Sequence, residues 1–238
     1  MSFTPRTAIV AAICFAMSSP LLAQTAADPS GHWEGAVTIP DRTLDFQIDI
    51  VRHADGSFAG AISLPQEHVK GLPLARIVVD GAAIAFSARS DQGFSGTLSA
   101  DGTTIRGDFS MPEGIVPFRM TRLGDARLDP VPVSARIDPA LEGTWNGIVQ
   151  GRQKQIRLVL KMANRADGSA SGSIVNVDEG GLELPVVIVQ DAANVTLQAT
   201  PVESSFTGTL SADGKTLAGT LHLGEQQAPL TFTKSARK

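Results

Sequence analysis

The sequence has few of the residues on which small exported domains and many binding sites depend. Its 238 residues include one cysteine, two tryptophans and no tyrosine, and aromatic residues make up 5%. The cysteine, Cys14, lies in an N-terminal segment that we expect to be removed. We therefore predict a mature chain without disulfides, in which packing alone stabilises each domain. The scarcity of Trp and Tyr also argues against a site that stacks sugars on exposed rings.

Positive charge is not in excess either. The chain has 20 Lys and Arg against 24 Asp and Glu, which gives a formal net charge of -4. A protein that binds nucleic acid or an anionic membrane surface needs a basic face, so these partners are set aside. Beyond the N-terminal segment, no apolar run approaches the roughly 20 residues that span a bilayer. We predict no transmembrane segment in the mature chain.

The residue patterns of common catalytic and metal sites are missing. No Gly-x-Ser-x-Gly pentapeptide, which would seat a hydrolase nucleophile, occurs in the chain. The Ala-Asp-Gly segments lack the series of oxygen ligands of a calcium loop. Four scattered histidines do not form the closely spaced pairs of zinc sites: His32, His53, His68 and His222. We predict no catalytic residues, no metal and no cofactor, and a protein that is not an enzyme.

The N-terminal segment has the features of an export signal. Arg6 provides a positive charge, residues 8–17 form an apolar run, and Pro20 interrupts it before Ala23. We predict a signal peptide over residues 1–23, with cleavage after Ala23. The mature protein is then expected to be periplasmic or secreted.

The sequence contains an internal repeat at an offset of 112 residues, the separation of Trp33 and Trp145. GHWEG around Trp33 matches GTWNG around Trp145, and FSGTLSADG at 94–102 matches FTGTLSADG at 206–214. An offset of this length is typical of a duplicated domain rather than of a solenoid. We predict copy one over residues 31–122, a proline-containing linker over 123–142 and copy two over 143–234.

Within each copy the hydrophobic pattern has a period of two. Apolar and polar residues alternate in LDFQIDI at 44–50 and in IRLVLKM at 156–162, which is typical of half-buried strands. The Ala-Asp-Gly segments predict hairpin turns, because glycine supplies the positive φ of a tight reversal. The turn spacing gives about eight strands per copy. Strands paired in sequence can close without a free edge, so we predict an all-β fold of two tandem antiparallel meander barrels rather than sandwiches.

Two resemblances accompany this pattern. The Gly-x-Trp sequences at Trp33 and Trp145 resemble the first strand of lipocalin, avidin and fatty-acid-binding barrels, in which the Trp plugs one end. Copy one is also similar to the all-β domain that precedes the catalytic domain in some bacterial exported α/β-hydrolases. That similarity includes the SLPQ sequence at 63–66, FSGTL at 94–98 and Pro117-Phe118. Because the domain occurs twice here without the hydrolase, the resemblance implies an accessory or binding domain used on its own.

A barrel of about eight strands is wide enough to hold one small ligand if side chains do not fill it. An apolar interior would select an apolar molecule. We predict an exported, non-catalytic protein that binds a small apolar ligand through Trp33, Phe46, Ile48, Ile84, Phe86, Trp145, Leu158 and Leu160. The alternative is that these residues fill solid barrels, and that the chain is an interaction or accessory module for an envelope protein.

The outward faces of the second strand differ in charge between the copies. Asp45 and Asp49 of copy one correspond to Arg157 and Lys161 of copy two. Complementary charge suggests that these faces meet across a pseudo-two-fold axis, within the chain or between chains. The alternative is two independently solvated faces.

Overall fold

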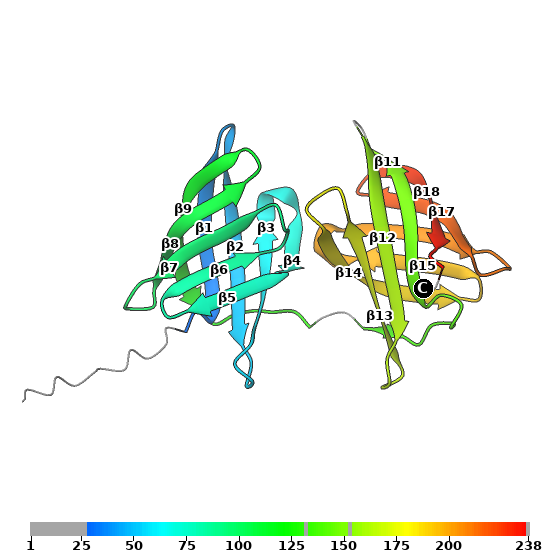
Figure 1. Ribbon diagram of the computed structural model, residues 1–238, viewed down its shortest axis with the longest axis horizontal. Coiled ribbons are helices and arrows are strands. Elements are labelled where there is room, and N and C mark those ends of the chain that lie inside the picture. The colour runs from blue at the N-terminus through cyan, green and yellow to red at the C-terminus, as the bar shows by residue number, and fades with distance from the viewer. Residues whose placement is uncertain (1–27, 131–132, 152–153, 237–238) are drawn as a thin grey trace, which may run out of the picture.

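The computed structural model describes residues 28–130, 133–151 and 154–236. The predicted signal peptide, its cleavage point after Ala23 and Cys14 lie outside the described residues. The described chain forms two antiparallel sheets, each curled into a barrel, and the barrels lie side by side (Figure 1). The predicted all-β pair of antiparallel barrels is confirmed. In this part of the chain, no helix has both the length and the hydrophobicity needed to cross a bilayer.

Barrel one consists of nine strands in the order β4-β3-β2-β1-β9-β8-β7-β6-β5. The 3-10 helix η1 (Pro65–Glu67) connects β3 to β4. The strands are β1 (Gly31–Ile39), β2 (Arg42–Arg52), β3 (Phe58–Leu64), β4 (Val69–Pro73), β5 (Arg76–Asp80), β6 (Ala83–Ser87), β7 (Gly93–Leu98), β8 (Thr104–Met111) and β9 (Gly114–Gly124).

Barrel two is a closed ring of eight strands, because β13 pairs with β14 as well as with β12. The short strand β10 (Ser134–Ala135) adds to β13, and the 3-10 helix η2 (Thr200–Val202) connects β15 to β16. The ring consists of β11 (Gly143–Gln150), β12 (Gln155–Asn164), β13 (Ser169–Asn176), β14 (Leu182–Asp191), β15 (Asn194–Ala199), β16 (Ser204–Leu210), β17 (Thr216–Leu223) and β18 (Gln226–Lys234).

One strand distinguishes barrel one from barrel two. Strand β14 is unbroken, whereas the corresponding part of barrel one is divided into β4, which pairs with β3, and β5, which pairs with β6. Between them, Leu74 donates its N–H to the Gly60 carbonyl on β3 at 2.9 Å, and Ala75 donates to the Ser87 carbonyl at 2.8 Å. The two edges of the curled sheet therefore meet at Leu74 and Ala75, with an interrupted ladder.

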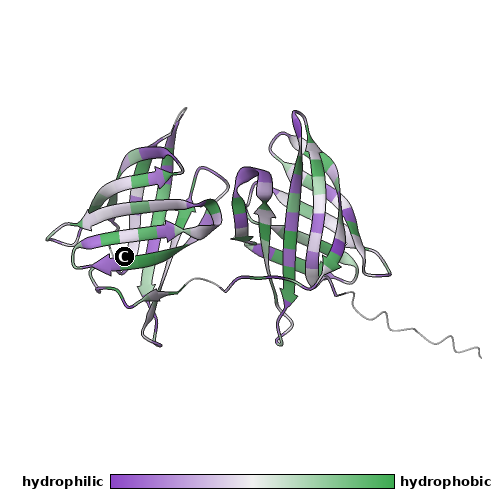
Figure 2. Cartoon of the chain, turned by 180° about the vertical axis from the view of Figure 1, so that it is seen from behind, coloured by the Kyte–Doolittle hydropathy of each residue, from purple (hydrophilic) through white to green (hydrophobic). Residues whose placement is uncertain are grey.

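The period-two pattern of the sequence determines which side chains face the barrel interiors. Hydrophilic and hydrophobic residues alternate along the strands of both barrels (Figure 2). In β2, Phe46, Ile48 and Ile50 are at most 1% exposed. Asp45, the residue before Phe46, points to the other face of the strand and is exposed. Burying one apolar face of every strand gives each barrel its own hydrophobic core.

A tryptophan closes one end of each barrel. Trp33 is fully buried, donates its indole N–H to the Pro29 carbonyl at 2.9 Å, and lies beneath the Arg122 guanidinium, 4.8 Å from the ring centroid. In barrel two, Trp145 is equally buried and donates to the Leu141 carbonyl, also at 2.9 Å. The Lys234 ammonium lies 5.2 Å from its ring centroid. Each plug thus combines burial, a hydrogen bond and a cation–π contact.

The segment predicted to be a linker, residues 123–142, packs on the barrels in its described parts. The Arg127 N–H donates to the Asp49 carboxylate on barrel one at 2.7 Å. Further along, β10 extends the sheet of barrel two, and Ile137 and Leu141 are buried in its core. These contacts attach the segment to both barrels.

Two of the contacts between the barrels lie at segments that are related by the 112-residue repeat. Ser90 of barrel one donates both its backbone N–H and its hydroxyl to the Gly180 carbonyl of barrel two, each at 2.8 Å. On the other side, η2 of barrel two contacts β4 of barrel one. Val202 of η2 lies 112 positions after Ser90, and His68, the residue before β4, lies 112 positions before Gly180. The two contacts therefore involve corresponding segments of the two copies.

Among the described residues, no ion pair joins the oppositely charged faces proposed from the sequence, although Asp49 and Lys161 line the two hollows between the barrels. Each of the four side chains has a partner within its own barrel. Asp45 accepts from Gln66, Asp49 from His32, and Arg157 and Lys161 pair with Asp178 and Glu183. Within the described chain the four side chains therefore do not pair with one another, because strand alternation indicates the outward face but not which neighbouring loop supplies a partner. Contact of these faces between two chains stays a prediction.

Candidate functional site

Three hollows of several hundred Å³ are candidate sites. Two of them, of about 730 and 640 Å³, lie between the barrels and are lined by residues of both. The third, of about 450 Å³, enters the interior of barrel one from its open end. We call this third hollow the mouth cavity.

The mouth cavity is lined mainly by inward-facing apolar side chains. They come from strands on opposite sides of the barrel: Val37, Leu44, Phe46, Ile62, Leu64, Leu72, Phe94 and Phe109. Phe46 lies nearer the β1–β2 hairpin than Ile48, whose register partner is Trp33. The cavity therefore occupies the half of barrel one that is remote from the tryptophan plug.

Barrel two supplies part of the cavity wall. Glu179, Leu182 and Val202 line it, and Leu182 and Leu184 pack against the core of barrel one. The turn before Leu182 contains Gly180, whose carbonyl accepts the two hydrogen bonds from Ser90. The site is thus formed by one barrel's interior and a cap from the other.

Ion pairs stabilise the loops around the mouth. Arg89 forms two hydrogen bonds to Asp91, at 3.0 and 2.8 Å, and these lower the pKa of the Asp91 carboxyl. Hydrogen bonds from Arg157 similarly lower the pKa of Asp178, in the capping turn, to about 2. Both carboxylates are consequently ionised at neutral pH.

Gly180→Ala is expected to loosen the cap, because a Cβ there would overlap the Asp91 carboxylate. Gly181→Ala is the matched control. Its φ of +68° resembles the +58° of Gly180, so alanine incurs similar backbone strain, but nothing lies within 4 Å of the added Cβ. Loss of one hydrogen bond predicts roughly tenfold faster exchange of the Ser90 amide in Gly180→Ala than in the control, measured by NMR. Equal protection in both variants would contradict the role of this contact.

The eight residues predicted to bind a ligand occupy different environments. Phe46 lines the mouth cavity, where its ring is 1% exposed. The others are buried in the two cores, outside the cavity lining: Trp33, Ile48, Ile84 and Phe86 in barrel one, and Trp145, Leu158 and Leu160 in barrel two. The sequence pattern did not predict Leu182 and Val202 as lining residues, because no local pattern indicates that one copy caps the other.

The interior of barrel two is occupied by its own core. Residues facing inward on all eight strands of the ring form one cluster, in which Leu160, Phe206 and Phe232 are at most 1% exposed. None of the three hollows described above enters this barrel. Of these three hollows, the one that enters a barrel interior is therefore the mouth cavity of barrel one.

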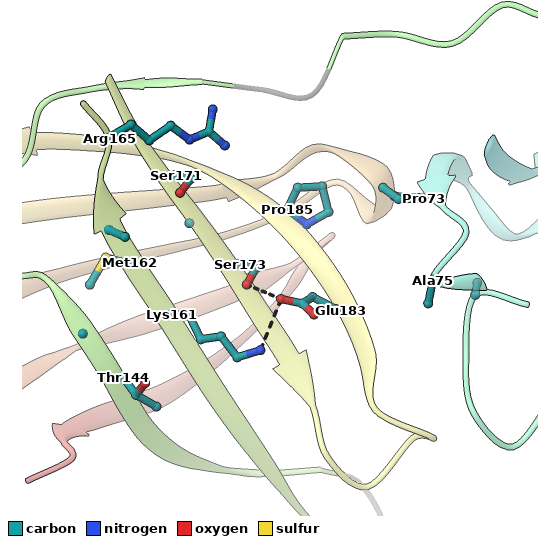
Figure 3. A pocket seen from close by; sticks show the side chains of 14 residues that line it. Pro73, Ala75, Thr144, Lys161, Met162, Arg165, Ser171, Ser173, Glu183 and Pro185 are labelled. Atoms are coloured by element: carbon teal, nitrogen blue, oxygen red, sulfur yellow. Dashed lines mark hydrogen bonds and ion pairs between the residues drawn. The ribbon is translucent and has the colours of Figure 1, made fainter. Parts of the chain in front are cut away.

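The smaller interbarrel hollow lies on the outer face of barrel two (Figure 3). There, Ser173 Oγ and Lys161 Nζ both donate to Glu183 Oε1, at 2.6 and 3.4 Å. The Lys161 and Glu183 side chains are about half exposed. A carboxylate beside a serine, without an imidazole among the lining residues, is a weak arrangement for activating a nucleophile. We interpret it as a cross-strand surface network.

The larger interbarrel hollow contains a buried polar pair. His32 and Asp49 are 7% and 8% exposed, and His32 Nδ1 lies 2.9 Å from Asp49 Oδ1. The same carboxylate oxygen accepts the Arg127 N–H. This pair fixes the path of the segment that leaves barrel one. Among the described residues, no group of three or more His, Cys, Asp or Glu is arranged to hold a metal ion.

Comparison with known proteins gives no family for the chain. No protein-family model and no curated protein matches it. Two solved structures align over most of its length. One is a provisionally named outer membrane protein from Bacteroides fragilis NCTC 9343, with 12% identity, TM-score 0.28, and coverage of 88% of this chain and 99% of that one. The other is a protein of unknown function of the DUF3598 family from Nostoc punctiforme PCC 73102, with 11% identity, TM-score 0.26, and coverage of 87% and 96%. Such low scores support no functional inference.

Proposed function

We propose that this chain is an exported, non-catalytic protein that binds a small apolar molecule in the mouth cavity of barrel one. The observation that carries the proposal is an apolar hollow of about 450 Å³ that enters barrel one, whereas the other two hollows described lie between the barrels. That volume falls within the roughly 300–1,000 Å³ of small-molecule sites. The signal-like N-terminal sequence supports export.

The chemistry of the lining supports binding rather than catalysis. The ionisable side chains at the cavity are Arg42, Glu67, Arg89 and Glu179, and its lining includes no histidine or cysteine. Arg42 pairs with Glu67, and Arg89 pairs with Asp91. Groups engaged in ion pairs at the rim are poorly suited to proton transfer inside the cavity.

Leu44→Trp is expected to abolish ligand binding, because Leu44 is half-buried and lines the mouth cavity. The larger ring would occupy the space of the ligand. Ile156→Trp is the matched control, because Ile156 is the corresponding half-buried residue of barrel two. Native mass spectrometry of protein isolated from its own periplasm should show a bound small molecule in the wild type and in Ile156→Trp, but not in Leu44→Trp.

A titration makes the same comparison quantitative. Calorimetry with 2-naphthol and with its saturated analogue decahydro-2-naphthol should show at least roughly tenfold weaker binding of both by Leu44→Trp, because overpacking a cavity costs at least about 1–3 kcal/mol. Affinity should be unchanged in Ile156→Trp. If both variants bind as the wild type does, or both lose binding equally, the mouth cavity is not the site.

A second function is supported by a different surface. The outer face of barrel two has a shallow hollow over β11, β17 and β18 in which Ile148, 58% exposed, lies beside Ala218 and Pro229. Exposed apolar surface of this kind suits a protein partner. An accessory role at the envelope, as the resemblance to hydrolase-linked domains suggests, would use this face. Crosslinking in cells through a photoreactive residue at Ile148 tests it.

A further inference from the structure

Barrel one contains an aromatic cluster that barrel two does not reproduce. Five phenylalanine rings are connected through Phe94, with centroid distances of 4.4 Å to Phe109, 4.9 Å to Phe86, and 5.1 Å to both Phe46 and Phe118. Among the described residues of barrel two, one pair, Phe206 and Phe232, forms such a contact. The ring-rich interior is thus specific to the barrel that has a cavity.

Three of these rings form part of the cavity wall. Phe46, Phe94 and Phe109 line it, whereas leucine stands 112 residues after two of them, at Leu158 and Leu221. Phe94 and Phe109 each retain 8% exposure within an otherwise closely packed core. Phe94 stacks on Phe109 with an interplanar angle of 29° and on Phe86 with one of 16°, so the surface that Phe94 and Phe109 offer to a ligand is this remaining exposed part.

The charges at the rim balance. Two cations, Arg42 and Arg89, and two anions, Glu67 and Glu179, line the entrance, and both arginines are already paired. An anionic head group entering the cavity would therefore lose its hydration without gaining a free cationic partner. A cationic one would have to compete with Arg89, whose pKa is raised by Asp91 and also by the charge of Glu179. An uncharged ligand has no such cost.

We propose that the ligand of the mouth cavity is an uncharged molecule carrying an aromatic ring, which packs in an offset or edge-to-face arrangement against the exposed parts of Phe94 and Phe109. This inference rests on the proposed function and specifies its ligand class. Aromatic contact adds roughly 0.5–1.5 kcal/mol beyond burial, which corresponds to a preference of about two- to thirteenfold over a saturated ring of the same skeleton. Selectivity then arises from contact with the aromatic rings and from the pairing of both rim arginines with carboxylates.

Calorimetric titration of the full mature chain with four matched probes tests the inference. The probes are 2-naphthol, decahydro-2-naphthol, 2-naphthoate and 2-naphthylmethylammonium. We expect 2-naphthol to bind about two- to thirteenfold more tightly than the saturated alcohol, and both ions to bind at least roughly tenfold more weakly than 2-naphthol. Phe109→Leu should abolish the aromatic preference without weakening the saturated alcohol, because barrel two accommodates Leu221 at that position. Phe46→Leu, which introduces the residue that barrel two has at Leu158, is the second variant if Phe109→Leu does not fold.

The possible results separate this inference from the proposed function. Equal or tighter binding of the saturated alcohol or of either ion overturns the ligand class and leaves the binding function standing. An aromatic preference that survives in both leucine variants also overturns it. If none of the four probes binds, both the ligand class and the binding function are overturned.

Discussion

Trp33→Ala is expected to lower the unfolding free energy of barrel one by about 3–5 kcal/mol, the cost usually found when a buried Trp or Phe is truncated. Trp33 is fully buried and closes the end of the barrel opposite the mouth cavity. Its removal deprives the Pro29 carbonyl of a donor and Arg122 of the ring beneath it. Because a domain of this size is stabilised by only about 5–15 kcal/mol, the loss should be visible as an early transition.

The amino-acid composition makes this experiment specific. The chain has two tryptophans and no tyrosine, so in Trp33→Ala the remaining Trp145 reports on barrel two alone. Circular dichroism reports on both barrels. Urea unfolding should show an early loss of β signal that Trp145 fluorescence does not follow. If the circular dichroism and fluorescence curves coincide and keep the wild-type midpoint, the Trp33 plug is not needed for the stability of barrel one. Trp145→Ala is the control. In this variant Trp33 fluorescence reports on barrel one, and barrel two is the one expected to unfold early.

Strand alternation predicted much of the architecture. The LDFQIDI sequence of residues 44–50 places Leu44, Phe46, Ile48 and Ile50 on one face, and the structure buries that face in barrel one. The same pattern did not predict that Asp49, on the outward face, is 8% exposed. Its burial depends on a segment 78 residues away in the chain, which a period of two does not encode. The division of β4 from β5 likewise follows from pairing with two different neighbours.

The candidate site was less predictable than the fold. Alternation shows that a side chain points inward, but whether space remains beside it depends on the volumes of residues on the opposite wall. Phe46 and Ile48 both point inward, yet Phe46 faces the cavity and Ile48 packs behind the Trp33 plug. Leu182 and Val202 complete the site from the other barrel. Their role arises from how the two barrels dock, which no local sequence pattern encodes.

The second large effect on stability arises from the close approach of backbone atoms in neighbouring strands rather than from the burial of side chains. Gly96 and Gly107 are register partners on β7 and β8. A Cβ added to Gly107 would overlap both the Ser95 carbonyl oxygen and Gly96 Cα. Gly208 and Gly219 show the same pairing in barrel two, where a Cβ on Gly219 would overlap a backbone carbonyl oxygen of β16. Backbone atoms cannot rotate away, so the strands would have to separate.

Gly107→Ala is therefore expected to destabilise barrel one by about 3 kcal/mol or more, at or above the upper end of the usual range for overpacking. Gly93→Ala, on the same strand pair, is the control, because its nearest atoms lie at 3.7 Å. In a Trp145→Phe background, Trp33 fluorescence follows barrel one alone during urea unfolding. Gly93→Ala should unfold at the urea midpoint of the parent protein, and Gly107→Ala at a clearly lower one. Similar midpoints in the two variants would contradict the close-approach argument. Because β7 and β8 carry Phe94 and Phe109, the same substitution should also weaken 2-naphthol binding in the fraction that remains folded.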